Sequence, residues 1–311
     1  MSEQRNVATA ILEQLSAWGV KNVYGLVGDN IFYLMDALAR RGTLNFYQVK
    51  HEESAALMAS AQAKLTGEMG VCIADGGPGT AHLVNGLADA FMDNVPVLAI
   101  TGQVARKDIG TNEKQYIDHQ SLLRPLVSYT NLLCDPASTA QVLENAWRPA
   151  VTDRLVSHVS VPMDVLSMPC DAGIIPHAPY LGSSPMSSPE VVTGALKKMR
   201  ESRRPVILVG AGGRKAGRVL GELSLRWGAA INTLAGMGVV DRDHPYYVGG
   251  LGHAGSPASS RLLSRADLCL IVGANWWPQN YVPKTIPVIQ IDLSPAHIGS
   301  TTAVAYGLVG G

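Results

Sequence analysis

The sequence predicts an α/β protein with two doubly wound, mainly parallel sheets, one in each of two domains joined by a linker rich in Pro and Ser. Helix-like and strand-like segments alternate along both halves of the 311 residues, which is typical of strand–helix–strand units. The strand-like segments are short apolar runs, as expected for strands buried on both faces. A stretch rich in Pro and Ser, without periodicity, separates the two halves.

The first predicted domain covers residues 1–165 and begins with an amphipathic helix. Val7, Ile11, Leu15 and Trp18 recur at helical spacing and give this helix one apolar face. Glycines mark the ends of several segments that follow it. The expected order is strand 22–28, helix 31–42, strand 45–50, helix 52–67, strand 69–75, helix 80–93, strand 95–102, helix 138–153 and strand 158–166.

Residues 166–188 are the predicted linker, and the second predicted domain covers residues 189–311. Its first strand lies in "RPVILVGAGG" and runs directly into a glycine loop. The expected elements after this loop are helix 216–228, strand 229–234, helix 259–267, strand 268–274 and strand 287–295.

Composition and charge exclude several classes of partner and site. Lys and Arg together number 25, as do Asp and Glu, so neither nucleic acid nor an acidic membrane is an expected partner. The four cysteines are far apart, which argues against a zinc site or a disulfide framework. The N-terminus does not read as a signal peptide, and no apolar run reaches membrane-spanning length. We therefore expect a cytoplasmic protein. Because only 16% of residues are charged, we also expect a homo- or hetero-oligomer that buries part of the surface.

Two features converge on one edge of the first predicted sheet. Glu52 begins a helix in the segment "HEESAA", and one helix and one strand separate it from the loop Gly77–Pro78–Gly79. In a parallel sheet both would lie at the carboxyl ends of the strands, where α/β proteins bind ligands. Each feature also has a purely structural interpretation. The carboxylate can stabilise the N-terminus of its helix, and the loop can be a tight strand-to-helix connection.

Ordered motifs extend this pattern over almost the whole chain. In the first half they are "GLVGD", "HEESAA", "GVC", "GPG", "HLVNGL", "NVPVLAITGQ" and Gln115. In this order they resemble the pyrimidine-binding domain of thiamine-diphosphate-dependent enzymes, in particular the pyruvate oxidase and acetolactate synthase group. In the second half "GAGGRKAG", "DRDHPYYVGG" and "VIQIDLSPAHIG" resemble the Rossmann-like middle domain of pyruvate oxidases.

The resemblance implies that Glu52 is catalytic and hydrogen-bonds N1′ of the aminopyrimidine, which activates C2 of the thiazolium. Glu53 is then the solvated, structural neighbour. Gln115 corresponds to a glutamine of the substrate pocket, although the preceding residue is Lys114 where the family has Phe. An ammonium at this wall suits a more anionic substrate, or it extends to the surface. The implied pyrimidine contacts are Gly28, Glu52, Gly77, Pro78, Gly79, His82 and Asn85.

For His82 a hydrogen-bonded packing role is an equal alternative. In the second domain the resemblance implies FAD, although His253 stands where pyruvate oxidases carry Arg and some relatives keep this domain without flavin. Taken alone, the glycine loop is a weak signal that a tight turn also explains. The implied FAD contacts are Gly210, Gly212, Gly213, His253 and Asp292.

The family holds the diphosphate and Mg²⁺ on a third domain with a Gly-Asp-Gly motif, and this motif does not occur in the 311 residues. We expect no metal ligands in this chain. We also expect a companion subunit that carries this domain and shares the thiamine diphosphate, or else a truncated sequence. The small-residue face formed by Ala55, Ala56, Ala59 and Ala63 is expected to pack against that partner.

The implied reaction is decarboxylation of a pyruvate-like 2-oxo acid, followed by transfer of the acyl carbanion to an acceptor by carboligation or oxidation. Two other classes remain open. One is a flavin- or nicotinamide-binding oxidoreductase that uses only the Gly210 loop, and the other is a non-catalytic binding module that retains the fold.

Overall fold

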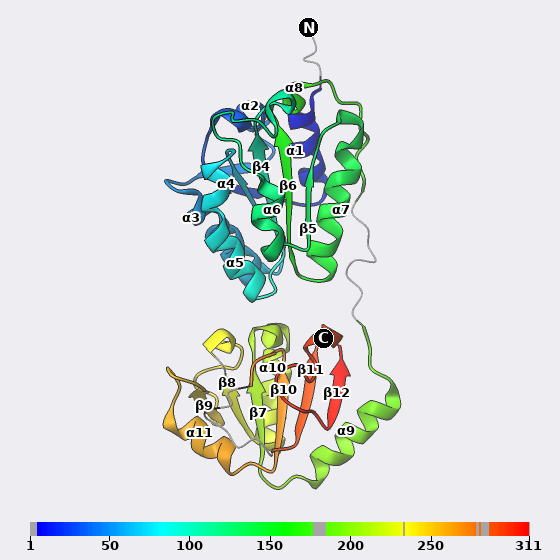
Figure 1. Ribbon diagram of the computed structural model, residues 1–311. Coiled ribbons are helices and arrows are strands. Elements are labelled where there is room, and N and C mark those ends of the chain that lie inside the picture. Colours follow the sequence, from blue (N-terminus) through cyan, green and yellow to red (C-terminus); the bar gives the residue numbers. More distant parts are fainter. Residues whose placement is uncertain (1–4, 177–184, 233, 278–279, 281–285, 311) are drawn as a thin grey trace. The chain divides into compact units, whose positions relative to one another are not determined.

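The computed structural model describes residues 5–176, 185–232, 234–277, 280 and 286–310 (Figure 1). The chain divides into two compact units, Met1–Gly182 and Ser183–Gly311, and each is built on its own parallel sheet. The predicted α/β class with two parallel sheets is confirmed. The division falls inside the predicted linker 166–188, whose two ends stay predictions. Within the described ranges no helix has the length and apolar character needed to cross a bilayer.

The sheet of the first unit has the order β2-β1-β3-β4-β6-β5, with every pair parallel. Chain order reverses between β1 and β3, so the loops that follow these two strands leave the sheet in opposite directions. The strands are β1 (Asn22–Gly25), β2 (Asn45–Gln48), β3 (Gly70–Ala74), β4 (Val97–Gln103), β5 (Tyr129–Leu132) and β6 (Val156–Pro162).

Helices cover both faces of this sheet (Figure 1). One core contains buried residues of α1, α2, α7 and α8, and the other contains those of α3 and α5. All four residues of the predicted apolar face of the first helix are buried in the former core. The helices are α1 (Val7–Ala17), α2 (Phe32–Arg41), α3 (Glu52–Thr66), α4 (Pro78–His82), α5 (Val84–Met92), α6 (His119–Leu123), α7 (Thr139–Thr152) and α8 (Met163–Ser167).

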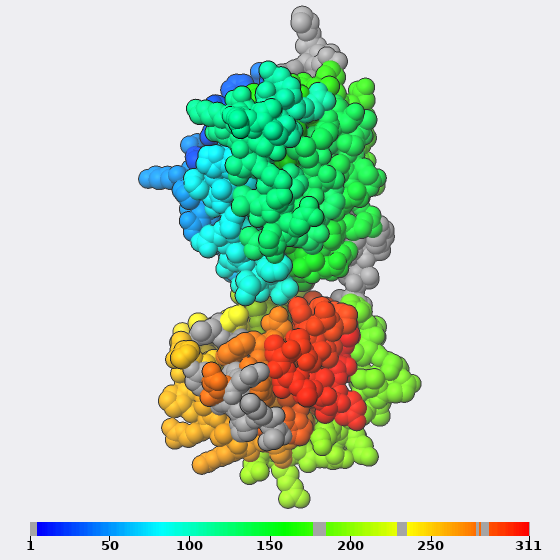
Figure 2. All heavy atoms as spheres, viewed as in Figure 1, coloured from blue at the N-terminus to red at the C-terminus, as the bar shows by residue number. Residues whose placement is uncertain are grey.

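The small residues of α3 pack inside the first unit, so the expectation that they form a partner surface is wrong. Ala55, Ala56, Ala59 and Ala63 are all 0% exposed, in the core shared with α5. A Cβ added to Gly86 of α5 would lie only 2.5 Å from the Cβ of Ala56. The two helices therefore approach closely because both present small side chains. The exposed apolar residues are Leu57, Met58 and Leu65 of α3 and Phe91 and Met92 at the end of α5, which lies at the surface in Figure 2.

Two predicted elements are divided or change type in the structure. The helix expected over 80–93 begins at Pro78 and is divided at Leu83, which nevertheless keeps helical backbone angles. The strand expected over 158–166 ends at Pro162, and residues Met163–Ser167 form helix α8. The apolar run continues through this change because Val165 and Leu166 of α8 are buried in the same core as the strand.

The sheet of the second unit has the order β12-β11-β10-β7-β8-β9, again with every pair parallel. This is the Rossmann order, with the reversal between β7 and β10. Buried residues of α9 and α10 pack on one face and those of α11 on the other. The elements are α9 (Pro189–Glu201), β7 (Pro205–Val209), α10 (Gly217–Trp227), β8 (Ala229–Asn232), β9 (Tyr247–Gly250), α11 (Pro257–Ser264), β10 (Leu268–Val272), β11 (Val288–Asp292) and β12 (Tyr306–Val309).

Candidate functional site

The predicted residues of the first unit lie at the carboxyl edge of its sheet, around the β1/β3 switch point, in loops and in the helices that follow them. Gly28 follows β1, and Glu52 begins α3 after β2. Gly77 is the residue before α4, Pro78 and Gly79 begin that helix, and Gln115 lies between β4 and α6. The close contacts described below join these four loops, so the topology concentrates the predicted site at one place.

Glu52 is a buried carboxylate at the N-terminus of a long helix. Its residue is 7% exposed, and its Oε2 lies 2.9 Å from Nδ1 of His82. Its Oε1 lies 3.3 Å from the place where a Cβ on Gly79 would be. A buried carboxylate needs polar partners, and His82 together with the helix N-terminus supplies them. The second oxygen faces Gly79, at the start of α4.

The glycines of the loops are required by close contacts. A Cβ on Gly28 would lie 2.3 Å from the carboxyl carbon of Asp75. Gly77 has a φ of +57°, in the left-handed region, and a Cβ there would lie 2.3 Å from the carbonyl oxygen of Gln115. Side chains at either position would push the loops apart. Gly28 and Gly77 are therefore required by packing between the loops, and Gly79 is the glycine that lies beside Glu52.

Sequence reasoning missed two polar residues, Asn30 and Asp75, that hydrogen-bond these loops to each other. Asp75 ends the β3 segment, and its Oδ1 accepts the backbone N–H of Asn30 at 2.8 Å. The side chain of Gln115 lies 3.4 Å from both Asn30 and Asp75. Gln115 also has a left-handed φ of +71°. The position of Asp75, directly between a buried strand and two glycines, was the available signal.

Asn85 and His82, two further predicted pyrimidine contacts, each interact with a neighbouring side chain. Asn85 is exposed and donates to Oε1 of Glu53, so its amide faces the neighbouring carboxylate and not Glu52. The rings of His51 and His82 stack with centroids 4.3 Å apart. His51, Glu52 and His82 each place one ligand atom within 4.8 Å of the others, a set that could hold a metal ion. An ion there would compete with any ligand of Glu52.

Pro78 and Lys114 are both exposed. The ammonium of Lys114 therefore has access to solvent, in keeping with the structural alternative for this residue.

In the second unit, packing between two loops explains the glycines after β7. A Cβ on Gly210 would lie 2.2 Å from the carbonyl oxygen of Gly273, and one on Gly212 would lie 2.8 Å from its Cα. The amide of Gly210 donates to Val272, and that of Gly212 donates to Gly273 at 3.0 Å. Both amides thus already donate to carbonyl groups within the second unit.

The other residues predicted to hold FAD lie at the same edge of the second sheet. Asp292 ends β11, and its Oδ1 accepts the backbone N–H of Ser294 at 2.9 Å and lies 3.1 Å from Nδ1 of His297. His253 is exposed in the loop after β9. Gly213 is buried against the side chain of Val209. The predicted residues therefore contact other parts of the protein.

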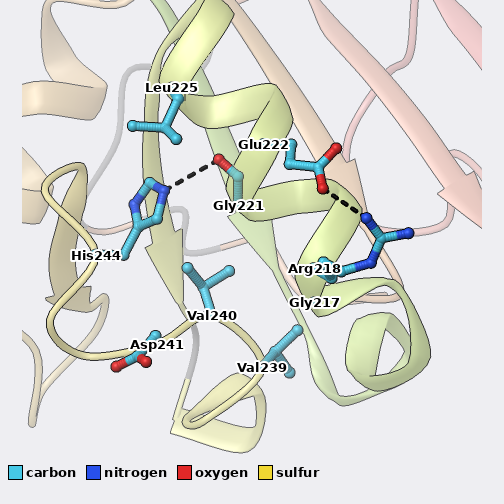
Figure 3. Close-up of a pocket in the computed structure, with 9 residues that line it drawn as sticks. All are labelled: Gly217, Arg218, Gly221, Glu222, Leu225, Val239, Val240, Asp241 and His244. Atoms are coloured by element: carbon cyan, nitrogen blue, oxygen red, sulfur yellow. Dashed lines mark hydrogen bonds and ion pairs between the residues drawn. The ribbon is translucent and has the colours of Figure 1, made fainter.

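A hollow of about 340 Å³ lies between α10 and the segment before β9 (Figure 3). Figure 3 shows His244 directed at the carbonyl of Gly221, 3.0 Å away, and an ion pair between Arg218 and Glu222. None of the residues predicted to hold FAD contributes to the lining, which consists of Gly217, Arg218, Gly221, Glu222, Leu225, Val239, Val240, Asp241 and His244.

Comparison with known families assigns both halves of the chain to one family. Residues 5–122 match the model of the "Thiamine pyrophosphate enzyme, N-terminal TPP binding domain", where thiamine pyrophosphate is another name for thiamine diphosphate. Residues 192–311 match that of the "Thiamine pyrophosphate enzyme, central domain". This chain belongs to the thiamine pyrophosphate enzyme family. The suspected resemblance is thereby confirmed for both halves.

Relatives in this family include enzymes of both suspected types. The chain is 33% identical to pyruvate oxidase of Lactiplantibacillus plantarum, over 96% of this chain and 51% of that protein. It is 31% identical to acetolactate synthase of Arthrospira platensis, over 97% of this chain and 56% of that protein. An uncharacterized 42.6 kDa protein of Pseudomonas amyloderamosa is 34% identical, over 98% of this chain and 78% of that protein. The chain thus spans about half the length of the two enzymes.

Proposed function

We propose that this chain supplies the pyrimidine-binding half of a thiamine diphosphate site that decarboxylates a pyruvate-like 2-oxo acid and passes the acyl group to an acceptor. The observation that carries the proposal is the placement of Glu52. It is buried at the β1/β3 switch point, with one oxygen on His82 and the other facing the glycine loop. The family match and the enzymes named above support the same assignment.

The residues of the site suit an aminopyrimidine ring. Oε1 of Glu52 faces Gly79, which has no side chain to cover this oxygen. When bound, thiamine diphosphate supplies a nucleophilic carbon and an electron acceptor for loss of CO₂. Glu52 would hold a proton at the ring nitrogen of the aminopyrimidine. His82 would donate to Oε2 and leave Oε1, beside Gly79, for that ring nitrogen.

We assign the diphosphate and Mg²⁺ to a domain outside residues 1–311, supplied by a companion subunit or by further sequence. Mg²⁺ prefers an octahedral set of hard oxygen ligands. The Gly-Asp-Gly motif that serves this purpose in the family does not occur in the sequence.

FAD stays a prediction for the second unit. The amides of Gly210 and Gly212 are used inside the protein, and His297 contacts Asp292, so no step is assigned to flavin. The same observations disfavour an oxidoreductase that depends on the Gly210 loop alone. A non-catalytic module would not require a carboxylate buried beside Gly79.

Calorimetry with thiamine and thiamine diphosphate tests whether this chain binds only the pyrimidine part of the cofactor and leaves the diphosphate to another domain. If this chain contacts only the pyrimidine and thiazolium part, thiamine and thiamine diphosphate should bind it with dissociation constants within about threefold of each other. Mg²⁺ should change neither value, and EDTA should have no effect. Tight, Mg²⁺-dependent binding of thiamine diphosphate alone would place the diphosphate site in this chain and contradict the proposal.

A further inference from the structure

A buried row of polar side chains lies behind the glycine loop, and the proposed reaction uses none of them. His119, Thr101 and His158 are each 0% exposed. Nε2 of His119 lies 3.1 Å from the backbone nitrogen of Gly77, and its Nδ1 lies 3.2 Å from Oγ1 of Thr101. Thr101 Oγ1 lies 2.9 Å from Nε2 of His158, whose Nδ1 lies 2.8 Å from Oγ1 of Thr130.

The chemistry of these groups determines where each proton lies. A backbone N–H only donates, so Nε2 of His119 carries a lone pair, and the proton of the neutral ring is on Nδ1. Nδ1–H then donates to Thr101, whose hydroxyl proton is left to donate to Nε2 of His158. The proton of His158 is consequently on Nδ1 and is donated to Thr130. Every bond in this row has a donor and an acceptor in one arrangement, which a buried network requires.

The bond from Gly77 holds the loop at a residue that has to be glycine. Gly77 has a left-handed φ, and its Cα faces the backbone of Gln115. Its amide is the N-cap amide of α4, the short helix that carries His82 toward Glu52. A protonated His119 would present an N–H to this N–H and repel it. Burial lowers the pKa of His119 to about 4, although the Asp118 carboxylate opposes the shift, so the accepting form is the stable one.

We propose that His119 is a positioning residue of the thiamine diphosphate site: its neutral Nδ1–H tautomer holds the Gly77 amide and thereby places the Gly77–Pro78–Gly79 segment beside Glu52. This inference rests on the proposed function, and it identifies the group that keeps this segment in place.

Two substitutions test the hydrogen bonds of the two ring nitrogens of His119 separately. In His119→Gln the amide oxygen takes the place of Nε2 and can still accept from Gly77. In His119→Asn the side chain reaches only the place of Nδ1, so Thr101 keeps a donor and Gly77 loses its acceptor. Both variants remove the titrating ring, and circular dichroism reports whether each one folds.

The first measurement is ¹⁵N NMR of the wild-type chain labelled at histidine, which reports the tautomer of each ring. We expect a proton on Nδ1 of His119 and a lone pair on its Nε2. Hydrogen exchange at the Gly77 amide should stay within about twofold of wild type in His119→Gln and rise about tenfold in His119→Asn. The dissociation constant for thiamine diphosphate should follow the same order.

A proton on Nε2, or unchanged exchange at Gly77 in His119→Asn, would overturn the positioning role. Faster exchange with unchanged affinity would overturn its link to the cofactor. A wild-type chain that binds neither thiamine nor thiamine diphosphate would overturn the proposed function, and the cofactor role of His119 with it, whatever the tautomer.

Discussion

Glu52→Gln should abolish activation of the cofactor while leaving the fold intact. Glutamine has nearly the same shape as glutamate and can retain the contact with His82, but its amide cannot hold and return a proton at the ring nitrogen. Exchange of the C2 hydrogen of bound thiamine diphosphate for deuterium measures this step in the assembly that contains the diphosphate-binding domain. We expect the rate to fall by about 10²–10⁴-fold, the usual contribution of a general acid or base.

Glu53→Gln is the matched control for this substitution. Glu53 lies one residue further along α3, is half-buried, and accepts from Asn85. It should therefore keep the wild-type exchange rate within about threefold, because it does not face the glycine loop. Wild-type exchange in Glu52→Gln, or an equal loss in Glu53→Gln, would remove Glu52 from its assigned role.

The stability of the first unit should decrease as the pH falls below 6.5. Burial lowers the pKa of His119 from 6.5 to about 4 and that of His158 from 6.5 to about 3, where the nearby His119 adds to the effect. Below pH 6.5 both rings bind protons in the unfolded chain. In the folded chain His119 binds a proton only near pH 4 and His158 only near pH 3. Protons therefore favour unfolding, by up to about 1.4 kcal/mol per pH unit for each ring.

Urea unfolding between pH 6.5 and 5 measures this slope, because ordinary carboxyl groups remain ionised over that range. Near-UV circular dichroism follows the first unit through the stacked rings of Trp18 and Trp147. His119→Gln keeps the Gly77 acceptor without a titrating ring, so it should reduce the slope by about half. A wild-type stability that does not change over this range would show that the two rings are not held neutral in the folded state.

The sequence predicted the central strands because these are apolar on both faces. All residues of β3 and β4 are buried, and their apolar runs were recognised. The edge strand β5 was missed, since its residues are only half-buried or exposed and show no such run. Helix α9 was also missed, and only Ala195 among its residues is buried.

The candidate site was predicted as loops, but its internal contacts were not. Parallel topology alone places Glu52 and Gly77 at one edge of the sheet, so their proximity follows from the order of the elements. The contact of His119 with Gly77 depends on the side-chain direction at the start of α6 and on the left-handed backbone of Gln115, which no motif records. Conversely, the glycines after β7 resemble a ligand loop in sequence, yet contact with Gly273 suffices to require them.

The most direct test of the central claim is a titration of the ¹⁵N-labelled chain with thiamine diphosphate, followed by NMR at the backbone amides. Even weak binding shifts the amides that face the ring. We expect the shifts to concentrate at Gly28, Gly77 and Gly79, with Gly210 and Gly212 unchanged, and we expect Glu52→Gln to reduce them. Shifts confined to the glycines after β7, or none up to millimolar ligand, would contradict the assignment of the pyrimidine site to the first unit.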